Sequence, residues 1–243
     1  MAKRKKEEQG RRDTPRITSG YLNSGGGADT ARVASIEKAY DDLVDSSRGD
    51  NKESLSAETI QEYLESLDVN MENAELFVMM ELIQAPGIGE ITRQGFIDGW
   101  KGTDLTTFSK AAQKNYIRHK VAQLCIDPTY FRKVYRHAFI AGKEASQKAL
   151  PLENALVFWQ LLFSYPGRPW KSANRDWAKL WETFLNEKWT RSVNKDMWNM
   201  TLEFANKAMD DETLSFYSEE DSWPAVIDEF VAWYRQRDAM DVN

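Results

Sequence analysis

Apolar side chains recur every three or four residues along most of this chain, which is the spacing of amphipathic α-helices. These stripes predict helices over residues 36–44, 56–67, 92–100, 106–126, 128–143 and 152–163. Residues 76–83 are apolar nearly all round, so this helix should be buried. Three C-terminal stripes begin at Trp177, Trp198 and Ile227. No segment of any length alternates with strand period, so the predicted fold class is all-α.

Residues with side-chain oxygens stand where several of these helices should begin. Such oxygens accept hydrogen bonds from the first backbone N–H groups of a helix. We expect N-caps at Ser56, Asn70, Asp127 and Asn194. Pro128 follows Asp127 at the first helical position, which proline favours.

One short pattern occurs twice, 36 residues apart: Leu55-Ser56 and Ile91-Thr92, each followed by a helix. The repetition resembles a pair of EF-hands, in which an apolar residue at loop position 8 pairs with its twin. Calcium would need several carboxylates, including a bidentate glutamate at position 12. Counting back from Leu55 and Ile91, only Asp50 and the turn residue Gly89 fit. We therefore expect an EF-hand-like lobe that binds no calcium.

Composition narrows the chemistry. Hydrophobic residues make up 42% and charged residues 29% of the 243 residues, and no apolar run is long enough for a membrane span, so we expect a soluble protein. One cysteine and two histidines leave no plausible zinc site. Cys125 shares a helical stripe with Leu124, which favours buried packing over nucleophilic catalysis. No phosphate loop, nucleophile elbow or histidine–carboxylate cluster occurs, so we expect neither enzyme nor cofactor.

Charge is distributed unevenly. Residues 1–16 carry +4, and the remainder carries -10. An acidic body argues against a nucleic-acid partner and suits a basic protein. Residues 1–28 have the composition of a disordered tail, which is either a solubilising segment or a nuclear-import signal.

An acidic stretch runs from Ala208 to Tyr234. It contains eight acids and no Lys or Arg, and its acids surround Phe216, Tyr217 and Trp223. A solvated loop and helix face would explain the charge, and a docking patch for a basic partner would explain the aromatics as well. Both interpretations remain open.

Two motifs lie in the C-terminal third. Residues 194–199 read Asn-Lys-Asp-Met-Trp-Asn, and residues 221–231 read Asp-Ser-Trp-Pro-Ala-Val-Ile-Asp-Glu-Phe-Val. They resemble the KDxW and WPxxIDxF motifs of the defective-in-cullin-neddylation family. The resemblance covers residues 33–236 and implies a potentiating-neddylation (PONY) domain over 29–238. Its lobes would span about 29–126 and 127–238, with a short tail at 239–243.

The resemblance also implies two binding sites. Family members bind the winged-helix end of a cullin through an Asp–Ala–Asp patch, which matches Asp196, Ser222 and Asp228 here; Ser222 departs from the alanine. A pocket for the N-acetylated methionine of the conjugating enzyme matches ten positions: Ile60, Leu76, Met79, Ile83, Ala85, Ile88, Ile91, Ala141, Phe158 and Leu161. Ala141 and Ile88 replace a typical phenylalanine and glutamine. The alternative is that these positions form ordinary core between the lobes.

The function implied is that of a monomeric, non-catalytic adaptor that promotes transfer of the ubiquitin-like modifier Nedd8 onto a cullin lysine, in the nucleus and cytoplasm. An EF-hand-like interaction module with other partners, independent of calcium, is the alternative. A calcium sensor and a nucleic-acid binder rank below both.

Overall fold

The computed structural model describes the chain from residue 25 to residue 241, with side chains for 29–237. This part holds ten α-helices: α1 (Gly25–Asp41), α2 (Ala57–Ser66), α3 (Glu75–Leu82), α4 (Arg93–Lys101), α5 (Lys110–Ile126), α6 (Pro128–Gly142), α7 (Leu152–Leu162), α8 (Trp177–Lys188), α9 (Lys195–Asp210) and α10 (Ala225–Asp241). The four strands have two residues each: β1 (Ser54–Leu55), β2 (Ile91–Thr92), β3 (Ala149–Leu150) and β4 (Val193–Asn194). The predicted all-α class is confirmed.

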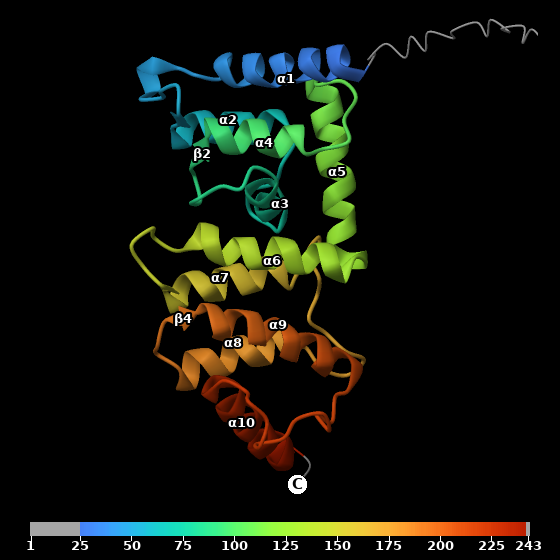
Figure 1. Ribbon diagram of the computed structural model, residues 1–243. Coiled ribbons are helices and arrows are strands. Elements are labelled where there is room, and N and C mark those ends of the chain that lie inside the picture. Colours follow the sequence, from blue (N-terminus) through green and yellow to red (C-terminus); the bar gives the residue numbers. More distant parts are fainter. Residues whose placement is uncertain (1–24, 242–243) are drawn as a thin grey trace, which may run out of the picture.

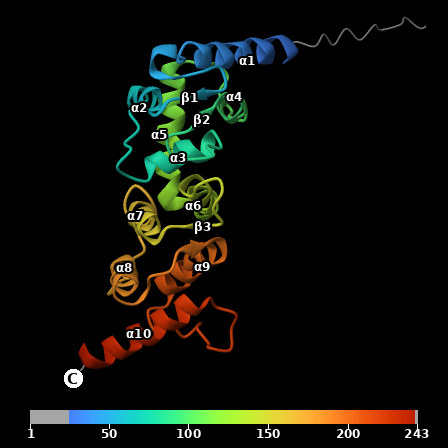
Figure 2. The same cartoon turned by 90° about the vertical axis from the view of Figure 1, so that its left-hand side faces the viewer.

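The helices stack in successive layers from α1 at one end to α10 at the other (Figures 1 and 2). Helix α5 runs along this stack and connects the layers near α1 with α6 (Figure 1). No helix in the described part is long and apolar enough to span a bilayer.

Most of the predicted N-cap residues do cap a helix with their side-chain oxygens. Ser56 accepts from the backbone N–H of Thr59, and Asp127 and Asn194 cap α6 and α9 in the same way. The predicted cap at Asn70 is wrong. Its side chain accepts from the backbone of Glu72 in the preceding turn, and α3 begins only at Glu75.

The two short strand pairs join segments far apart in the sequence. Leu55 pairs with Ile91 in the antiparallel pair β1–β2, which ties the start of α2 to the start of α4. Leu150 pairs with Val193 in β3–β4, which holds the segment before α7 against the segment before α9.

Buried apolar side chains form two clusters. An N-terminal core draws on residues between Ile36 and Ala141, and a C-terminal core draws on residues between Ala74 and Tyr234. Helix α3 gives Met79 to the first and Phe77 to the second, so it is buried on opposite faces. This explains why its sequence is apolar nearly all round.

Aromatic contacts hold the start of α9 in place. The Tyr135 hydroxyl donates to the Trp198 carbonyl at 2.8 Å, and the Trp198 indole donates to the Tyr135 carbonyl at 2.9 Å. Trp159 stacks on Trp198 with ring centroids 5.1 Å apart. The first turn of α9 is therefore attached to both α6 and α7.

Two expectations about the helices need correction. Cys125 is exposed rather than buried, and the next residue, Ile126, is 78% exposed. Near the end of α5, Leu124 is buried, whereas Cys125 and Ile126 are exposed. Helix α1 begins at Gly25, inside the segment predicted as tail, and residues 1–24 lie outside the described part.

Candidate functional site

Asp196 stands in the first turn of α9. The Asn194 side chain caps this helix by accepting from the Met197 N–H at 2.8 Å. Asp196 is exposed, and no hydrogen bond or ion pair within the described residues engages its carboxylate. An acid in a first helical turn is favoured by the helix dipole, so this charge is stable there while remaining free for a partner.

Asp228 occupies the equivalent place in α10. It is half-buried and accepts a hydrogen bond from the Tyr217 hydroxyl at 2.8 Å. Burial and the neighbouring Asp228 carboxylate raise the pKa of Tyr217 to about 12. Tyr217 thus remains a neutral donor that holds the Asp228 side chain in one orientation.

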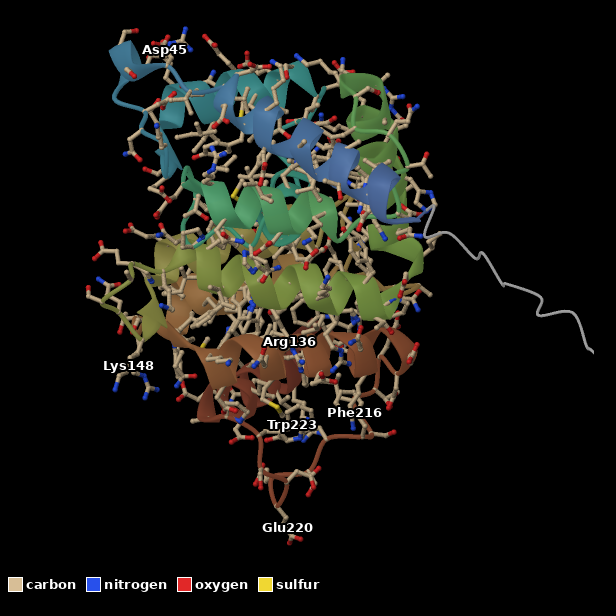
Figure 3. The ribbon with its side chains drawn as sticks, turned by 45° about the horizontal axis from the view of Figure 1, so that its top comes forward. Asp45, Arg136, Lys148, Phe216, Glu220 and Trp223 are labelled. Atoms are coloured by element: carbon tan, nitrogen blue, oxygen red, sulfur yellow. The ribbon has the colours of Figure 1, made fainter. Side chains whose placement is uncertain are left out.

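Ser222 lies exposed on the loop between α9 and α10. Figure 3 shows Glu220 at the outer tip of this loop, with Phe216 and Trp223 at its base. Phe216 and Trp223 pack on each other with ring centroids 6.3 Å apart. Because Ser222 is exposed, its hydroxyl disturbs no packing.

One ion pair joins the segment before α9 to the first turns of α10. The Arg191 guanidinium lies 3.4 Å from the Glu229 carboxylate, next to Asp228 in the sequence. Arg191 also covers the Trp189 ring at 3.9 Å from its centroid. An exposed pair of this kind adds little stability, but it shows that the two segments are adjacent.

Five of the eight acids of the Ala208–Tyr234 stretch form two groups. Asp211 and Glu212 are used inside the protein: Asp211 accepts from Thr213 and Ser215, and Glu212 accepts from the Asn174 backbone at 2.7 Å. Hydrogen bonds from Ser172 and Asn174 lower the pKa of Glu212 to about 2.

The second group is exposed and free. Among the described residues, nothing engages the carboxylates at the loop tip, which belong to Glu219, Glu220 and Asp221. The negative charge available to a partner therefore includes this tip, exposed Asp210 and Asp196, and Asp228 adds a carboxylate that is oriented by Tyr217.

The ten apolar positions lie on α2, α3, α6, α7, β2 and the loop between α3 and β2. Most of them belong to the N-terminal core, while Phe158 and Leu161 pack with the C-terminal core. The Ile88 N–H donates to the Ala141 carbonyl at 2.9 Å, which fastens the loop to the end of α6. Because seven of these positions belong to or pack against one core and two to the other, the set spans both cores, and we name it the apolar junction.

Burial differs among these ten positions. Seven are buried, Leu76 and Leu161 are half-buried, and Ile88 is 44% exposed.

Phe158 is tightly packed. Its ring lies edge-on against Phe77, with ring centroids 4.9 Å apart, and directly against the backbone of Gly142, where an added Cβ would lie 2.2 Å from the Phe158 ring. Four cavities elsewhere are lined by other residues. Most of these side chains are packed against their neighbours in this conformation.

Asp50 is the single acid retained from the first calcium-loop pattern. Asp50 is 6% exposed, and its carboxylate accepts from the Ser56 N–H at 2.5 Å, the Asp45 N–H at 2.8 Å and the Thr59 hydroxyl at 2.7 Å. Thr59 stands at position 12, where a calcium loop has its glutamate. Donors of the protein itself thus surround the carboxylate.

No group of three or more potential metal-binding side chains occurs in the part of the chain that the structure describes. The buried histidine, His137, contacts the Ala85 carbonyl at 3.0 Å, and burial lowers its pKa.

Two contacts at the acidic surface were missed by sequence reasoning. The Tyr217–Asp228 hydrogen bond crosses the loop before α10, and the Arg191–Glu229 ion pair joins segments on either side of α9 and that loop. No helical or strand period connects such positions, so periodicity carries no signal for them. The aromatic residues within the acidic stretch were the sequence feature that indicated side-chain contacts there.

Comparison with known proteins defines the class. Residues 112–233, from α5 into α10, match the family model described as "Cullin binding". This range contains Asp196, Ser222 and Asp228. The chain is thus a helical protein with a cullin-binding domain.

Curated relatives identify the family. "Defective in cullin neddylation protein 1" of Pyricularia oryzae is 44% identical, over 89% of this chain and 81% of the relative. The protein of the same name in Yarrowia lipolytica is 26% identical, over 80% of this chain and 77% of the relative. Human "DCN1-like protein 4" is 29% identical, over 75% of this chain and 58% of the relative. The chain belongs to the defective-in-cullin-neddylation family.

Proposed function

We propose that this protein is a non-catalytic adaptor of cullin neddylation, which binds a cullin and an N-acetylated conjugating enzyme at the same time. Transfer of the modifier Nedd8 then occurs between two partners held close together. The observation that supports this proposal most is the separation of two chemically distinct surfaces: free acids at the start of α9 and on the α9–α10 loop, and apolar residues between α3, α6 and α7.

The acidic surface would receive the cullin. Asp196 is exposed and free, Asp228 is oriented by Tyr217, and Ser222 lies exposed on the loop between them in sequence. Fixed carboxylates of this kind attract a basic surface and determine how it docks. The names of the relatives, which refer to cullin neddylation, support a cullin as the partner.

The apolar junction would receive the acetylated methionine. Acetylation removes a charge that would be costly to bury among apolar side chains. The exposed Ile88 and the half-buried Leu76 and Leu161 form the accessible part of the set.

The adaptor would contribute proximity. Two docked partners react as if within one molecule, which raises the effective concentration of the attacking lysine near the charged enzyme. The exposed Cys125 plays no part in this mechanism.

Binding measurements with separate partners test the proposal. Asp196→Lys combined with Asp228→Asn should weaken binding to the cullin winged-helix domain and leave binding of the acetylated peptide unchanged. Asparagine preserves an acceptor for Tyr217, so Asp228→Asn removes charge without removing the hydrogen bond. Equal cullin affinity for the variant and the wild type would contradict the placement of the cullin site.

The calcium-independent character of the N-terminal lobe is a further part of the proposal. The Asp50 carboxylate supports it, because its oxygens already accept three hydrogen bonds from the protein. Nuclear and cytoplasmic residence is also proposed, from the basic residues 1–16, which lie outside the described part.

A further inference from the structure

A cavity of about 160 Å³ lies between α7 and the start of α8, and none of its lining residues belongs to the acidic surface or to the ten apolar positions. Its walls come from the last two turns of α7, the start of α8, and Lys171 and Asp176 in the segment between these helices. A dry cavity of about 150 Å³ in another protein holds benzene, so this volume suits one aromatic ring with a small substituent.

The inner wall of the cavity is aromatic. Trp159, Phe163 and Trp181 line it, and each of them is at most 3% exposed. The Trp159 and Trp181 rings meet edge-to-face at 5.6 Å. Half-buried Leu156 and Ala178 complete the apolar lining.

One polar group on this wall has no partner. The Trp181 indole N–H is fully buried and donates to no atom in the described part of the chain. By contrast, the Trp159 indole donates to the Tyr135 hydroxyl at 2.7 Å. A buried donor without an acceptor is costly, so an occupant of the cavity that supplied an acceptor would gain a hydrogen bond.

The charges at the mouth neutralise each other. Lys171 pairs with Asp176 at 2.8 Å, and Lys179 pairs with Glu182 at 3.1 Å. A charged ligand would have to disrupt one of these pairs, whereas a neutral ligand would not. The mouth therefore favours an uncharged occupant.

We propose that this cavity is a binding site for a neutral, ring-sized small molecule that carries one hydrogen-bond acceptor, which receives the Trp181 indole proton. The aromatic wall provides the contact area, the indole provides the orientation, and the paired rim excludes net charge. The site uses none of the residues assigned to the cullin or conjugating-enzyme surfaces, although it shares α7 with the latter.

A matched pair of probes tests the hydrogen bond. Acetophenone and α-methylstyrene have nearly the same shape, but only acetophenone has a carbonyl oxygen. In indole N–H spectra of the full chain, acetophenone should cause a saturable downfield shift of the Trp181 signal, assigned by its loss in Trp181→Phe. At equal concentration α-methylstyrene should bind about three- to tenfold more weakly and cause no downfield shift.

A filled cavity provides the second test. Ala178→Leu should reduce acetophenone affinity at least about tenfold, because the added carbons occupy the site. Ala232→Leu on an exposed position of α10 is the matched control and should bind normally. The absence of a saturable Trp181 shift in the wild type, as expected of a cavity that holds only water, would overturn the proposal. Equal affinity for the two probes would overturn the role of Trp181, whether or not Ala178→Leu folds.

Discussion

Asp50→Asn removes the charge at the centre of the loop before α2 while almost preserving the shape of the side chain. In the native protein both carboxylate oxygens accept hydrogen bonds, from the backbone of Asp45 and Ser56 and from the Thr59 hydroxyl. An amide has one acceptor oxygen, and its NH₂ group would face another donor. We expect the variant to fold but to be less stable.

The size of the effect follows from the pKa of Asp50. Burial raises this pKa, but the hydrogen bonds from Thr59, Asp45 and Ser56 outweigh burial and lower it from 3.8 to about 2. At neutral pH a difference of this size corresponds to about 2 kcal/mol between the ionised and the protonated carboxyl, and we expect a loss of the same order from Asp50→Asn. For a chain of this length, that loss lowers the unfolding midpoint by about 4–8 °C.

The pH dependence has a definite sign. Because folding lowers the pKa of Asp50, its stabilisation is complete above the unfolded value of 3.8 and is lost as the pH falls through about 2. Thermal unfolding of wild type and Asp50→Asn from pH 7 to pH 2 should therefore show a gap that narrows toward acid. A variant as stable as the wild type at pH 7, or a gap that does not narrow, would refute this explanation of the loop.

The remaining predictions concern ligands, location and the cysteine. Calorimetric titration with millimolar calcium should show no saturable heat, and a micromolar site would revive the calcium-sensor interpretation. An acetyl-methionine peptide of the conjugating enzyme should bind at least about tenfold more tightly than its free-amine form, and Ile88→Glu should abolish that preference. Phe158 is unsuitable for this test, because a charge there would disrupt its packing against Phe77. Deletion of residues 1–16 should shift a fluorescent fusion toward the cytoplasm; unchanged nuclear enrichment would leave the segment a solubilising tail. Cys125→Ala should change the unfolding free energy by less than about 0.5 kcal/mol and leave modifier transfer intact, because the residue is exposed.

Local features of the fold were predictable from the sequence because they depend on neighbouring residues. Ser56, Asp127 and Asn194 each cap the helix that immediately follows them. The continuously apolar α3 was correctly predicted to be buried, since only a helix covered on opposite faces lacks a polar side. Asn70 failed as a cap because its side chain bonds within a turn, a competing use of the same oxygen.

Features that depend on tertiary packing were not predictable. Cys125 directly follows Leu124 in α5, but tertiary packing covers only the helix face that carries Leu124, so Cys125 is exposed. The orientation of Asp228 by Tyr217 requires the fold of a whole loop. The site residues were predicted from the motif resemblance alone. The sequence does not distinguish free acids from acids such as Asp211 and Glu212, which accept hydrogen bonds inside the protein.

The measurement that tests the adaptor most directly is single-turnover transfer of the modifier from a pre-charged conjugating enzyme to a cullin. Asp196→Lys with Asp228→Asn should slow transfer at least about tenfold at limiting adaptor, and added salt should slow the wild type as well. Glu53→Lys with Glu72→Gln makes the same change of charge at exposed positions of the other lobe and should leave the rate unchanged. Full activity of the Asp196/Asp228 variant, or equal slowing by the control, would contradict the proposed bridge.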